Sequence, residues 1–340
     1  MTGDSKDKGM TSAVHIVAEA GTTHEGDVDT ALRLIAAAQG AGADSVKFQF
    51  IDPAGLYLTR LRQDGALVDN PVVVAREAQR LSRDEWHRVA VYAAEQGIPF
   101  SASVFDVAYL RFLETLNPPY IKIASTDTNN HALIEAACAG GRTILLSTGM
   151  SALGEIEAAV EVVTRAGGEV VLMHCVSAYP CPAEIANVGF VGVLKSAFGV
   201  PVGFSDHTES SVAAVAAVAL GATWIEKHMT LDRAAKGFDH AYAMEPAMLA
   251  AYIGDIRAAE AALAPRHPKV GPQENAVRTR ARRSLWAARD LPVGHVLSAE
   301  DILVVRPAGP LAPSDLPHVL GRRLARPVME STAVRFEDLE

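Results

Sequence analysis

Short apolar segments alternate with longer amphipathic stretches along most of this chain, and that alternation constrains its fold more than any other feature. Several of the amphipathic stretches begin with Asp or Ser and end with Gly, as helices do. Strands separated by helices pair in parallel, and eight such units in about 250 residues predict a (β/α)8 TIM barrel, an α/β fold. A doubly wound sheet is the alternative, but it rarely needs eight strands of such even spacing. The eight apolar segments are Ile16–Gly21, Ser45–Phe50, Ile98–Phe105, Tyr120–Ser125, Thr143–Gly149, Val170–Val176, Val202–Thr208 and Trp224–Thr230.

The predicted barrel occupies residues 14–264 of the 340-residue chain. Residues 1–13 are polar and are expected to be disordered. Residues 265–281 contain prolines and many charges but no apolar periodicity, which predicts a linker. Residues 282–340 contain short strand-like pieces and a Pro-Val-Gly turn, so we expect a second, small β-rich domain there.

Composition narrows the possible partners and the compartment. The net charge of −9 and the pI near 5.7 argue against nucleic acid as a partner. No signal peptide is evident, and the longest apolar run, residues 212–225, is too short to span a bilayer, so we expect no membrane partner. Three cysteines make no disulfide framework, which fits the cytoplasm. We expect Cys175 to be a buried strand residue rather than a nucleophile.

Lysines stand inside two of the apolar segments, where an unpaired ammonium group would be costly. Lys47 and Lys122 could simply pair with nearby carboxylates, Glu19 and Asp127. In a barrel, however, side chains at the carboxyl ends of the strands converge on one mouth, and we expect Asp127 to face a substrate there. Two lysines among strand-end hydroxyls would form a cradle for an anion that carries a phosphate and a carboxylate. The serines of this anion cradle are Ser103, Ser125, Ser147 and Ser205.

Histidines end the last two predicted strands, which are neighbours in a barrel. A histidine at a strand end is usually structural, but the rings of His207 and His228 can come within reach of a single ion. Two imidazoles with positions left open for water or substrate suit a divalent metal such as Mn²⁺ or Zn²⁺. Asp206 and Glu226 stand beside them and are expected to fix the ring tautomers.

Motifs at the predicted strand ends resemble those of the N-acetylneuraminate (sialic acid) synthase family. The resemblance runs from residue 14 to residue 340, with the motifs in the same order. The tail, RRSLWAARDLPVGHVLSAEDILVVRP, is similar to that family's antifreeze-protein-like SAF domain. The barrel motifs are AEAGTTHEGDVDTALRLIAAAQGAGADSVKFQ, YIKIAST, LSTGMS, HCVSAYPCP, GFSDHT, EKHMTLD and GFDHAYAMEP.

The resemblance implies a transferase that joins phosphoenolpyruvate to the open-chain aldehyde of an amino sugar, typically N-acetylmannosamine. Carbon 3 of phosphoenolpyruvate attacks the aldehyde, and water then adds to the oxocarbenium centre before the C–O bond breaks. The products are a nine-carbon 2-keto-3-deoxy acid and phosphate. A Mn²⁺-type ion, with Mg²⁺, Co²⁺ or Zn²⁺ as alternatives, would bind His207 and His228 and polarise the aldehyde oxygen.

The resemblance also implies roles for single residues. Glu19 matches a carboxylate near the reacting centre, which acts as general base or substrate anchor. Gln49 and Tyr179 match further active-site positions, and Asp239 matches a residue that holds sugar hydroxyls. Arg306 matches an arginine that reaches the sugar from a partner subunit, which implies a domain-swapped homodimer. The positions that bind phosphoenolpyruvate are matched by Lys47, Ser103, Lys122, Ser125, Ser147, Ser177 and Ser205.

Several residues depart from the family pattern. Thr23 and Ser177 each replace a usual Asn, and Ser103 replaces a usual Thr. Residues 241–243, Ala-Tyr-Ala, replace Lys-Ala-Ser, which removes an ammonium and a hydroxyl group and adds an aromatic ring near the sugar. The acceptor therefore stays open: N-acetylmannosamine, a 2,4-diacetamido sugar of the legionaminic or pseudaminic type, or an unusual sugar of a surface polysaccharide or secondary metabolite.

Two other functions also stay open. One is a metal-dependent pyruvate aldolase acting on a sugar aldehyde, which would follow if the phosphate pocket has degenerated at Ser177. The other is a non-catalytic sugar-binding protein. The presence of Glu19, both lysines and both histidines argues against that last alternative.

Overall fold

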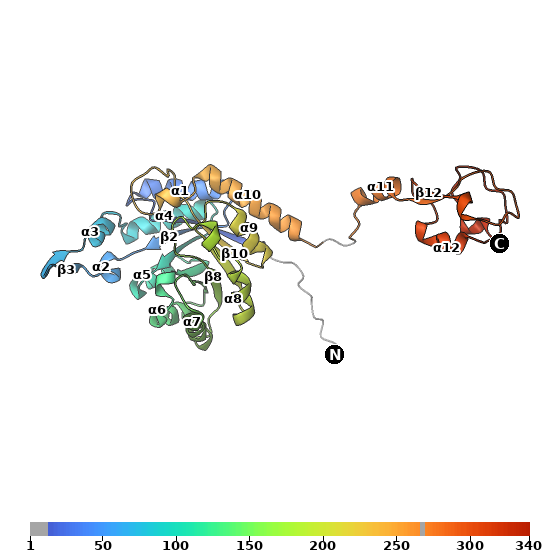
Figure 1. Ribbon diagram of the computed structural model, residues 1–340. Helices are drawn as coiled ribbons and strands as arrows, with labels where there is room; N and C mark the ends of the chain where they lie inside the picture. Colours follow the sequence, from blue (N-terminus) through green and yellow to red (C-terminus); the bar gives the residue numbers. More distant parts are fainter. Residues whose placement is uncertain (1–12, 266–268) are drawn as a thin grey trace, which may run out of the picture. The chain divides into compact units, whose positions relative to one another are not determined.

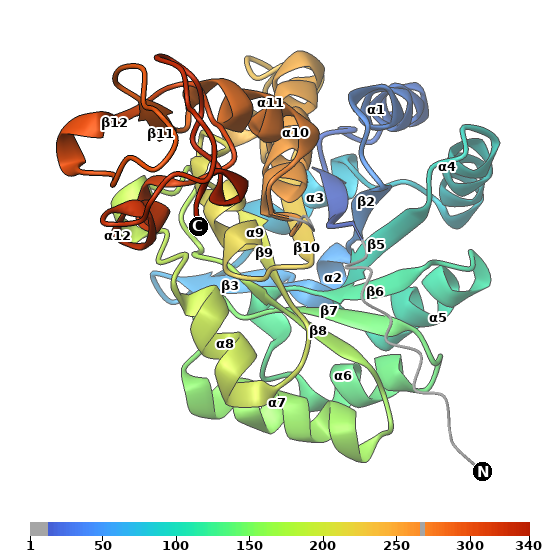
Figure 2. The same cartoon turned by 90° about the vertical axis from the view of Figure 1, so that its right-hand side faces the viewer.

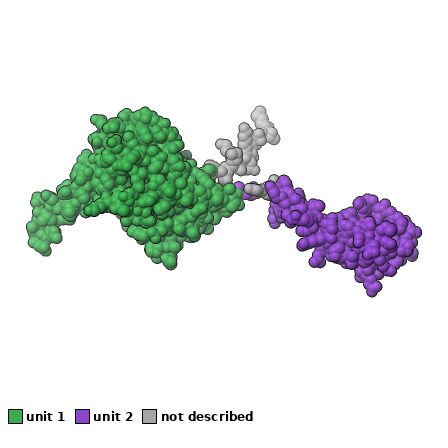
Figure 3. Space-filling model, turned by 90° about the horizontal axis from the view of Figure 1, so that it is seen from above, with its two compact units in different colours: residues 1–263 green, residues 264–340 purple. Residues whose placement is uncertain are grey.

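The computed structural model describes residues 13–265 and 269–340, which fall into two compact units divided between Leu263 and Ala264 (Figure 3). Of the N-terminus that we expect to be disordered, residues 1–13, all but Ala13 lies outside the described residues. Within the ranges just given, no helix combines the length and apolar character needed to cross a membrane.

The first unit is a closed barrel of eight parallel strands with helices around it, which confirms the predicted fold (Figures 1 and 2). The strands follow one another around the barrel in sequence order, and the last pairs with the first. Each strand falls on one of the eight predicted apolar segments. They are β1 (His15–Gly21), β2 (Ser45–Phe50), β5 (Phe100–Val104), β6 (Tyr120–Ile123), β7 (Thr143–Ser147), β8 (Val170–His174), β9 (Val202–Asp206) and β10 (Trp224–His228).

Helices connect the strands, and their ends follow the signals in the sequence. Before α1, the carboxylate of Asp27 accepts a hydrogen bond from the backbone nitrogen of Thr30 at 3.0 Å. Gly42 ends the same helix at φ = 88°, a left-handed conformation that glycine adopts without strain. The helices of this unit are α1 (Val28–Ala41), α2 (Pro53–Leu56), α3 (Pro71–Ala78), α4 (Arg83–Glu95), α5 (Val107–Thr115), α6 (His131–Cys138), α7 (Leu153–Arg165), α8 (Phe190–Phe198), α9 (Val212–Ala219) and α10 (Pro246–Leu263).

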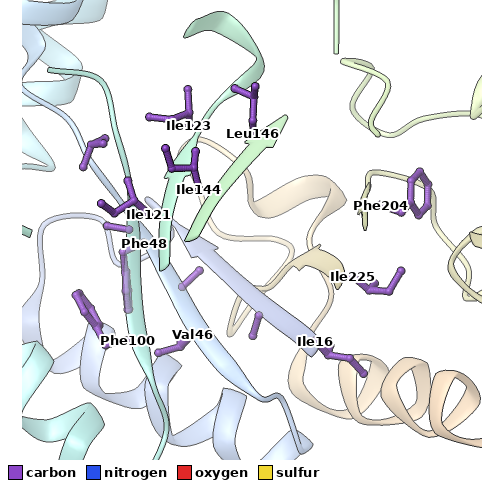
Figure 4. Packing of buried hydrophobic residues seen from close by; sticks show 14 of the residues in the cluster. Ile16, Val46, Phe48, Phe100, Ile121, Ile123, Ile144, Leu146, Phe204 and Ile225 are labelled. Atoms are coloured by element: carbon purple, nitrogen blue, oxygen red, sulfur yellow. The ribbon is translucent and has the colours of Figure 1, made fainter. Parts of the chain in front are cut away.

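Alternate side chains of each strand point to opposite sides of the barrel wall. One set packs with the helices in the main core, where Ile121, Ile144 and Phe48 lie (Figure 4). The other set forms a smaller apolar cluster that includes Val17 and Tyr120. Two residues further along the strands, the same side of the wall carries charged groups instead. The register of the barrel therefore decides which polar side chains meet inside it.

A β-hairpin that we did not predict lies between β2 and α3. Strands β3 (Arg60–Gln63) and β4 (Ala66–Asp69) pair antiparallel, and all their residues are exposed. Asp64 and Gly65 connect them with φ values of 48° and 83°, the left-handed conformation of a tight hairpin turn. Asp-Gly is a strong hairpin signal, so the sequence contained the information that we overlooked.

The second unit contains α11 (Pro272–Ala281), β11 (Ser284–Ala287), β12 (Ile302–Val305) and α12 (Leu316–Val319). The two strands pair antiparallel and contribute to a separate apolar core, as expected for a small β-rich domain. The segment predicted as a linker contains α11, which begins at Pro272, a residue that suits the first helical turn. The backbone nitrogen of Ala308 donates to the carbonyl oxygen of Thr279 at 3.1 Å, so this helix is bound to the rest of the second unit.

Candidate active site

A cavity of about 360 Å³ opens at the carboxyl ends of the barrel strands, where we expected the active site. Its wall contains the predicted catalytic residues and most of the predicted binding residues. Side chains from the ends of all eight barrel strands, or from the loops after them, therefore meet in one place. The predicted residues that line it are Glu19, Lys47, Gln49, Ser103, Lys122, Ser125, Ser147, Ser177, Tyr179, Ser205, His207 and His228.

The two buried lysines are paired with two buried glutamates. Lys47 Nζ lies 2.5 Å from Glu19 Oε2 and 3.7 Å from Glu226 Oε2. Lys122 Nζ lies 2.8 Å from Glu226 Oε1. The partner of Lys122 is therefore Glu226, whereas the sequence analysis had considered Asp127. Register places Glu19 beside Lys47 on the neighbouring strand, whereas Glu226 reaches Lys122 across the barrel.

Serine hydroxyls complete this buried cluster. Ser103 Oγ accepts a hydrogen bond from Lys47 Nζ at 2.8 Å, and Ser205 Oγ donates to Glu226 Oε1 at 2.9 Å. Each ammonium group therefore points at the cavity among groups that fix its position. A rigid pair of cations of this kind can hold an anion with little further ordering.

Burial and charge act differently on the two glutamates. Burial raises the pKa of Glu19 to about 7, more than the attraction of Lys47 lowers it. Burial also opposes ionisation of Glu226, but Lys122 and Lys47 together outweigh it and hold the pKa of that carboxyl well below its usual range. Glu226 is therefore a fixed anion, whereas Glu19 can take up or release a proton near neutral pH.

The rings of His207 and His228 lie side by side, with centroids 5.6 Å apart. Burial lowers the pKa of both, that of His228 to about 3, so both are neutral. His207 Nδ1 lies 2.8 Å from the carbonyl oxygen of Val176 and donates to it, which leaves a lone pair on Nε2. Nδ1 of His228 is buried and has no hydrogen-bond partner within the described part of the chain. Neutral imidazoles with free lone pairs are the form that binds metal ions.

The prediction that Asp206 and Glu226 fix the tautomers of these rings is wrong. Asp206 does not orient His207, because its carboxylate accepts from the Tyr252 hydroxyl at 2.8 Å and pairs with Lys227 at 3.3 Å. Glu226 is bound to the lysines rather than to His228. Residues 13–265 and 269–340 contain no group of three or more His, Cys, Asp or Glu side chains that could hold a metal ion. The donor set fits an ion with two protein ligands whose remaining positions go to water or substrate.

Gly149, which the sequence analysis did not single out, packs against three residues that line the cavity. A Cβ atom at this position would lie 2.7 Å from Ser177 Oγ, 2.8 Å from Ser125 Oγ and 2.9 Å from Cys175 Sγ. Cys175 lines the cavity, and its sulfur lies 3.1 Å from Ser125 Oγ. Only a glycine leaves space between these three groups.

Aromatic rings border the cavity next to the histidines. The centroid of the Tyr179 ring lies 4.3 Å from that of His207 and 5.0 Å from that of Tyr242. The Tyr242 hydroxyl donates to Asp239 Oδ1. Asp239 itself does not line the cavity but lies beside it, since a Cβ on Gly21 would be 3.0 Å from Asp239 Oδ2 and 3.4 Å from Nε2 of Gln49, which lines the cavity.

Two predicted site residues, and one residue that departs from the family pattern, lie elsewhere or have other partners. Asp127 does not line the cavity, because its carboxylate accepts from Thr126 at 2.8 Å and from Asn130 at 3.0 Å in the turn before α6. Arg306 follows β12 in the second unit, where it is exposed. Thr23, the residue that departs from the family pattern, is buried. Its hydroxyl donates to the carbonyl oxygen of Ala20 at 2.8 Å and so stabilises the backbone of this turn.

Comparison with known proteins adds to this geometry. The NeuB family model matches residues 34–267, and the SAF domain model matches residues 282–340. The chain is 32% identical to the N,N'-diacetyllegionaminic acid synthase of Legionella pneumophila, over 98% of this chain and 97% of the relative. It is also 32% identical to the N-acetylneuraminate-9-phosphate synthase of Mus musculus, over 96% of this chain and 92% of the relative.

Among solved structures, the chain is similar to N-acetylneuraminic acid (sialic acid) synthetase from Leptospira borgpetersenii, determined in complex with citrate. The two are 32% identical, with a TM-score of 0.71 over 78% of this chain and 90% of the other. Sequence and structure therefore select the same group of relatives.

Proposed function

The chain belongs to the NeuB family, and from that membership we propose that it is a phosphoenolpyruvate-dependent synthase of sialic-acid-like ulosonic acids. It joins carbon 3 of phosphoenolpyruvate to the aldehyde carbon of an open-chain sugar and releases phosphate. The observation that carries this proposal is the pair of buried lysines, Lys47 and Lys122, that face one cavity at the carboxyl ends of the strands. The names of the Legionella and mouse relatives support the same class of product.

Phosphoenolpyruvate carries a carboxylate and a phosphate, and the cavity offers a cation for each. Lys47 and Lys122 are 1% and 4% exposed, so water screens their charges little. The hydroxyls of the anion cradle add donors beside them, and charged hydrogen bonds in such a site are strong. The space around Gly149, bordered by Ser125 and Ser177, is the part of the cavity that we assign to the phosphate.

Glu19 is placed to move protons during the condensation. Gln49 Nε2 donates to Glu19 Oε1 at 3.0 Å, and Lys47 pairs with the other oxygen, so the carboxyl group is fixed in orientation. The aldehyde oxygen must gain a proton as the C–C bond forms, and the attacking water must lose one. A group whose pKa is about 7 can serve both steps.

We propose that His207 and His228 bind a divalent metal. Their neutral rings and the unpartnered buried Nδ1 of His228, in the part of the chain that the structure describes, support this. When bound, the ion supplies a Lewis acid that polarises the aldehyde oxygen. Mn²⁺ is the proposed ion, with Mg²⁺, Co²⁺ and Zn²⁺ as alternatives, because imidazole and oxygen donors suit all of them.

We also propose a domain-swapped homodimer in which Arg306 of one subunit reaches the sugar bound by the other. Arg306 is exposed, and it forms no ion pair among residues 13–265 and 269–340. A guanidinium group without a carboxylate partner is available to bind the hydroxyls of a sugar.

The test combines the protein with phosphoenolpyruvate, Mn²⁺ and a panel of aldoses, and measures released phosphate and product mass. The proposal predicts phosphate release with at least one aldose, and a product heavier than that sugar by one molecule of pyruvic acid. The Lys47→Met variant is the control, because it removes the charge and keeps the stem. Turnover of pyruvate without phosphate release would establish an aldolase instead, and binding of sugars without any turnover would establish a sugar-binding protein.

A further inference from the structure

Tyr242 lies beside the cavity and contacts two of the residues that line it. It belongs to a short 3₁₀ turn, His240–Tyr242, between β10 and α10. Its ring centroid lies 5.0 Å from that of Tyr179 and 5.2 Å from that of His228, and both of these residues line the cavity. The two tyrosines thus form a continuous aromatic surface beside the two histidines, where the proposed reaction places the aldehyde.

Tyr242 also engages Asp239. The phenol donates to Asp239 Oδ1, while Oδ2 lies 3.4 Å from the hydroxyl of Thr22. A sugar hydroxyl that approached this carboxylate would compete with hydrogen bonds already made within the protein.

The loop that carries Tyr242 is fastened on both sides. Glu25 Oε1 lies 3.1 Å from His240 Nε2, and His240 Nδ1 lies 2.7 Å from the hydroxyl of Thr230. Gly237 has φ = 137°, and a Cβ there would lie 2.0 Å from Glu25 Oε1, so the loop and Glu25 are in direct contact. Tyr242 is therefore held in place beside the cavity.

We propose that Tyr242 determines acceptor specificity, favouring an open-chain sugar that carries acetamido and deoxy groups over one that offers hydroxyls at the same carbons. Methyl groups of such a sugar would pack on the Tyr179 and Tyr242 faces, which reward apolar contact. Sugar hydroxyl groups gain less binding free energy, because the carboxylate of Asp239 already accepts hydrogen bonds from Tyr242 and Thr22. The inference rests on the proposed condensation and narrows its acceptor to the 2,4-diacetamido-trideoxyhexoses.

The test measures kcat and KM for two acceptors, N-acetylmannosamine and 2,4-diacetamido-2,4,6-trideoxymannose, with phosphoenolpyruvate saturating. The protein should prefer the second by about fourfold to fifteenfold in kcat/KM, the effect of burying one or two extra carbon groups. Tyr242→Phe keeps the ring and frees Asp239, so use of N-acetylmannosamine should rise while use of the diacetamido sugar is kept. Tyr242→Ala removes the ring as well, so use of the diacetamido sugar should fall too.

Two controls separate specificity from damage to the fold. Tyr57→Ala removes a tyrosine that does not line the cavity, and it should leave the preference unchanged. The KM for phosphoenolpyruvate should stay the same in every variant, because that substrate binds at the lysines. If Tyr242→Ala does not fold, Tyr242→Phe decides the matter alone.

The outcomes distinguish this inference from the function on which it rests. A protein that condenses both sugars but prefers N-acetylmannosamine overturns the inference and leaves the proposed function standing. The same follows if Tyr242→Phe and Tyr242→Ala keep the original preference. Absence of phosphate release with every aldose overturns both.

Discussion

Gly149 provides a direct test of the proposed phosphate space, because an alanine there would displace the side chains that border it. The added Cβ would approach Ser177 Oγ, Ser125 Oγ and Cys175 Sγ to within 2.7, 2.8 and 2.9 Å. Contacts this short do not persist, so the three side chains must leave their present positions. Gly149 is not among the described glycines with positive φ, so its backbone accepts alanine without strain.

The expected loss follows from the hydrogen bonds that the displaced hydroxyls can no longer donate. One hydrogen bond to a charged group is worth about 1.5–3 kcal/mol, so losing one raises the KM for phosphoenolpyruvate about tenfold to two-hundredfold. Stability should change much less, because Ser125 and Ser177 both border the cavity and can rotate into it. The melting temperature therefore serves as a check that the variant is folded.

Initial rates of phosphate release at varied phosphoenolpyruvate and saturating sugar give both kinetic constants. Gly154→Ala is the matched control: it makes the same change at the second residue of α7, where a Cβ would meet no atom within 4 Å. That control should keep the original KM. If Gly149→Ala also keeps it, the phosphate does not bind between Ser125 and Ser177, and the assignment of this space is wrong.

Four further results are expected. Lys122→Met should weaken phosphoenolpyruvate binding in calorimetry by about 2–5 kcal/mol, and an unchanged affinity would remove Lys122 from the anion cradle. His207→Ala or exhaustive chelation should abolish metal binding and most turnover, so full activity after either contradicts the metal site. Burial raises the pKa of Glu19 to about 7 in the substrate-free protein, so kcat/KM should rise with pH through that value as Glu19 loses its proton, and the residual activity of Glu19→Gln should not show this rise. Mixing the weakly active Glu19→Gln and Arg306→Ala proteins should raise activity above that of either alone, because a swapped mixed dimer has one site with both changes and one with neither. No gain in confirmed mixed dimers would place Arg306 outside the partner's site.

The barrel could be predicted because each strand is a short apolar run between helices with clear caps. Asp27 and Gly42 mark both ends of α1 in the sequence itself. The second unit shows the limit of this approach. Helix α11 buries none of its residues, so its sequence shows no apolar face from which a helix could be predicted. A backbone hydrogen bond from Ala308 connects it to the rest of the second unit. A helix that depends on such a contact leaves no periodic pattern.

The members of the site could be predicted from their position at strand ends, but their partners could not. Asp127 is close to Lys122 in sequence, yet its chain turns back so that Asn130 and Thr126 take its carboxylate. Glu226 is 104 residues away from Lys122 and reaches it across the barrel. Distance along the chain says little about which inward side chains meet, because closure of the barrel brings distant strands together.

Charge balance inside the barrel explains how a chain with a net charge of −9 can bind a phosphorylated anion. Lys47 and Lys122 bring two positive charges into the cavity, and ionised Glu226 compensates one of them. Glu19, with its pKa raised to about 7, carries only part of a charge at neutral pH, so the cluster is positive overall. An approaching anion raises that pKa further and favours protonated Glu19, which then no longer competes for Lys47. Substrate binding and proton uptake are therefore linked through one carboxyl group, the same group that the condensation needs as its proton carrier.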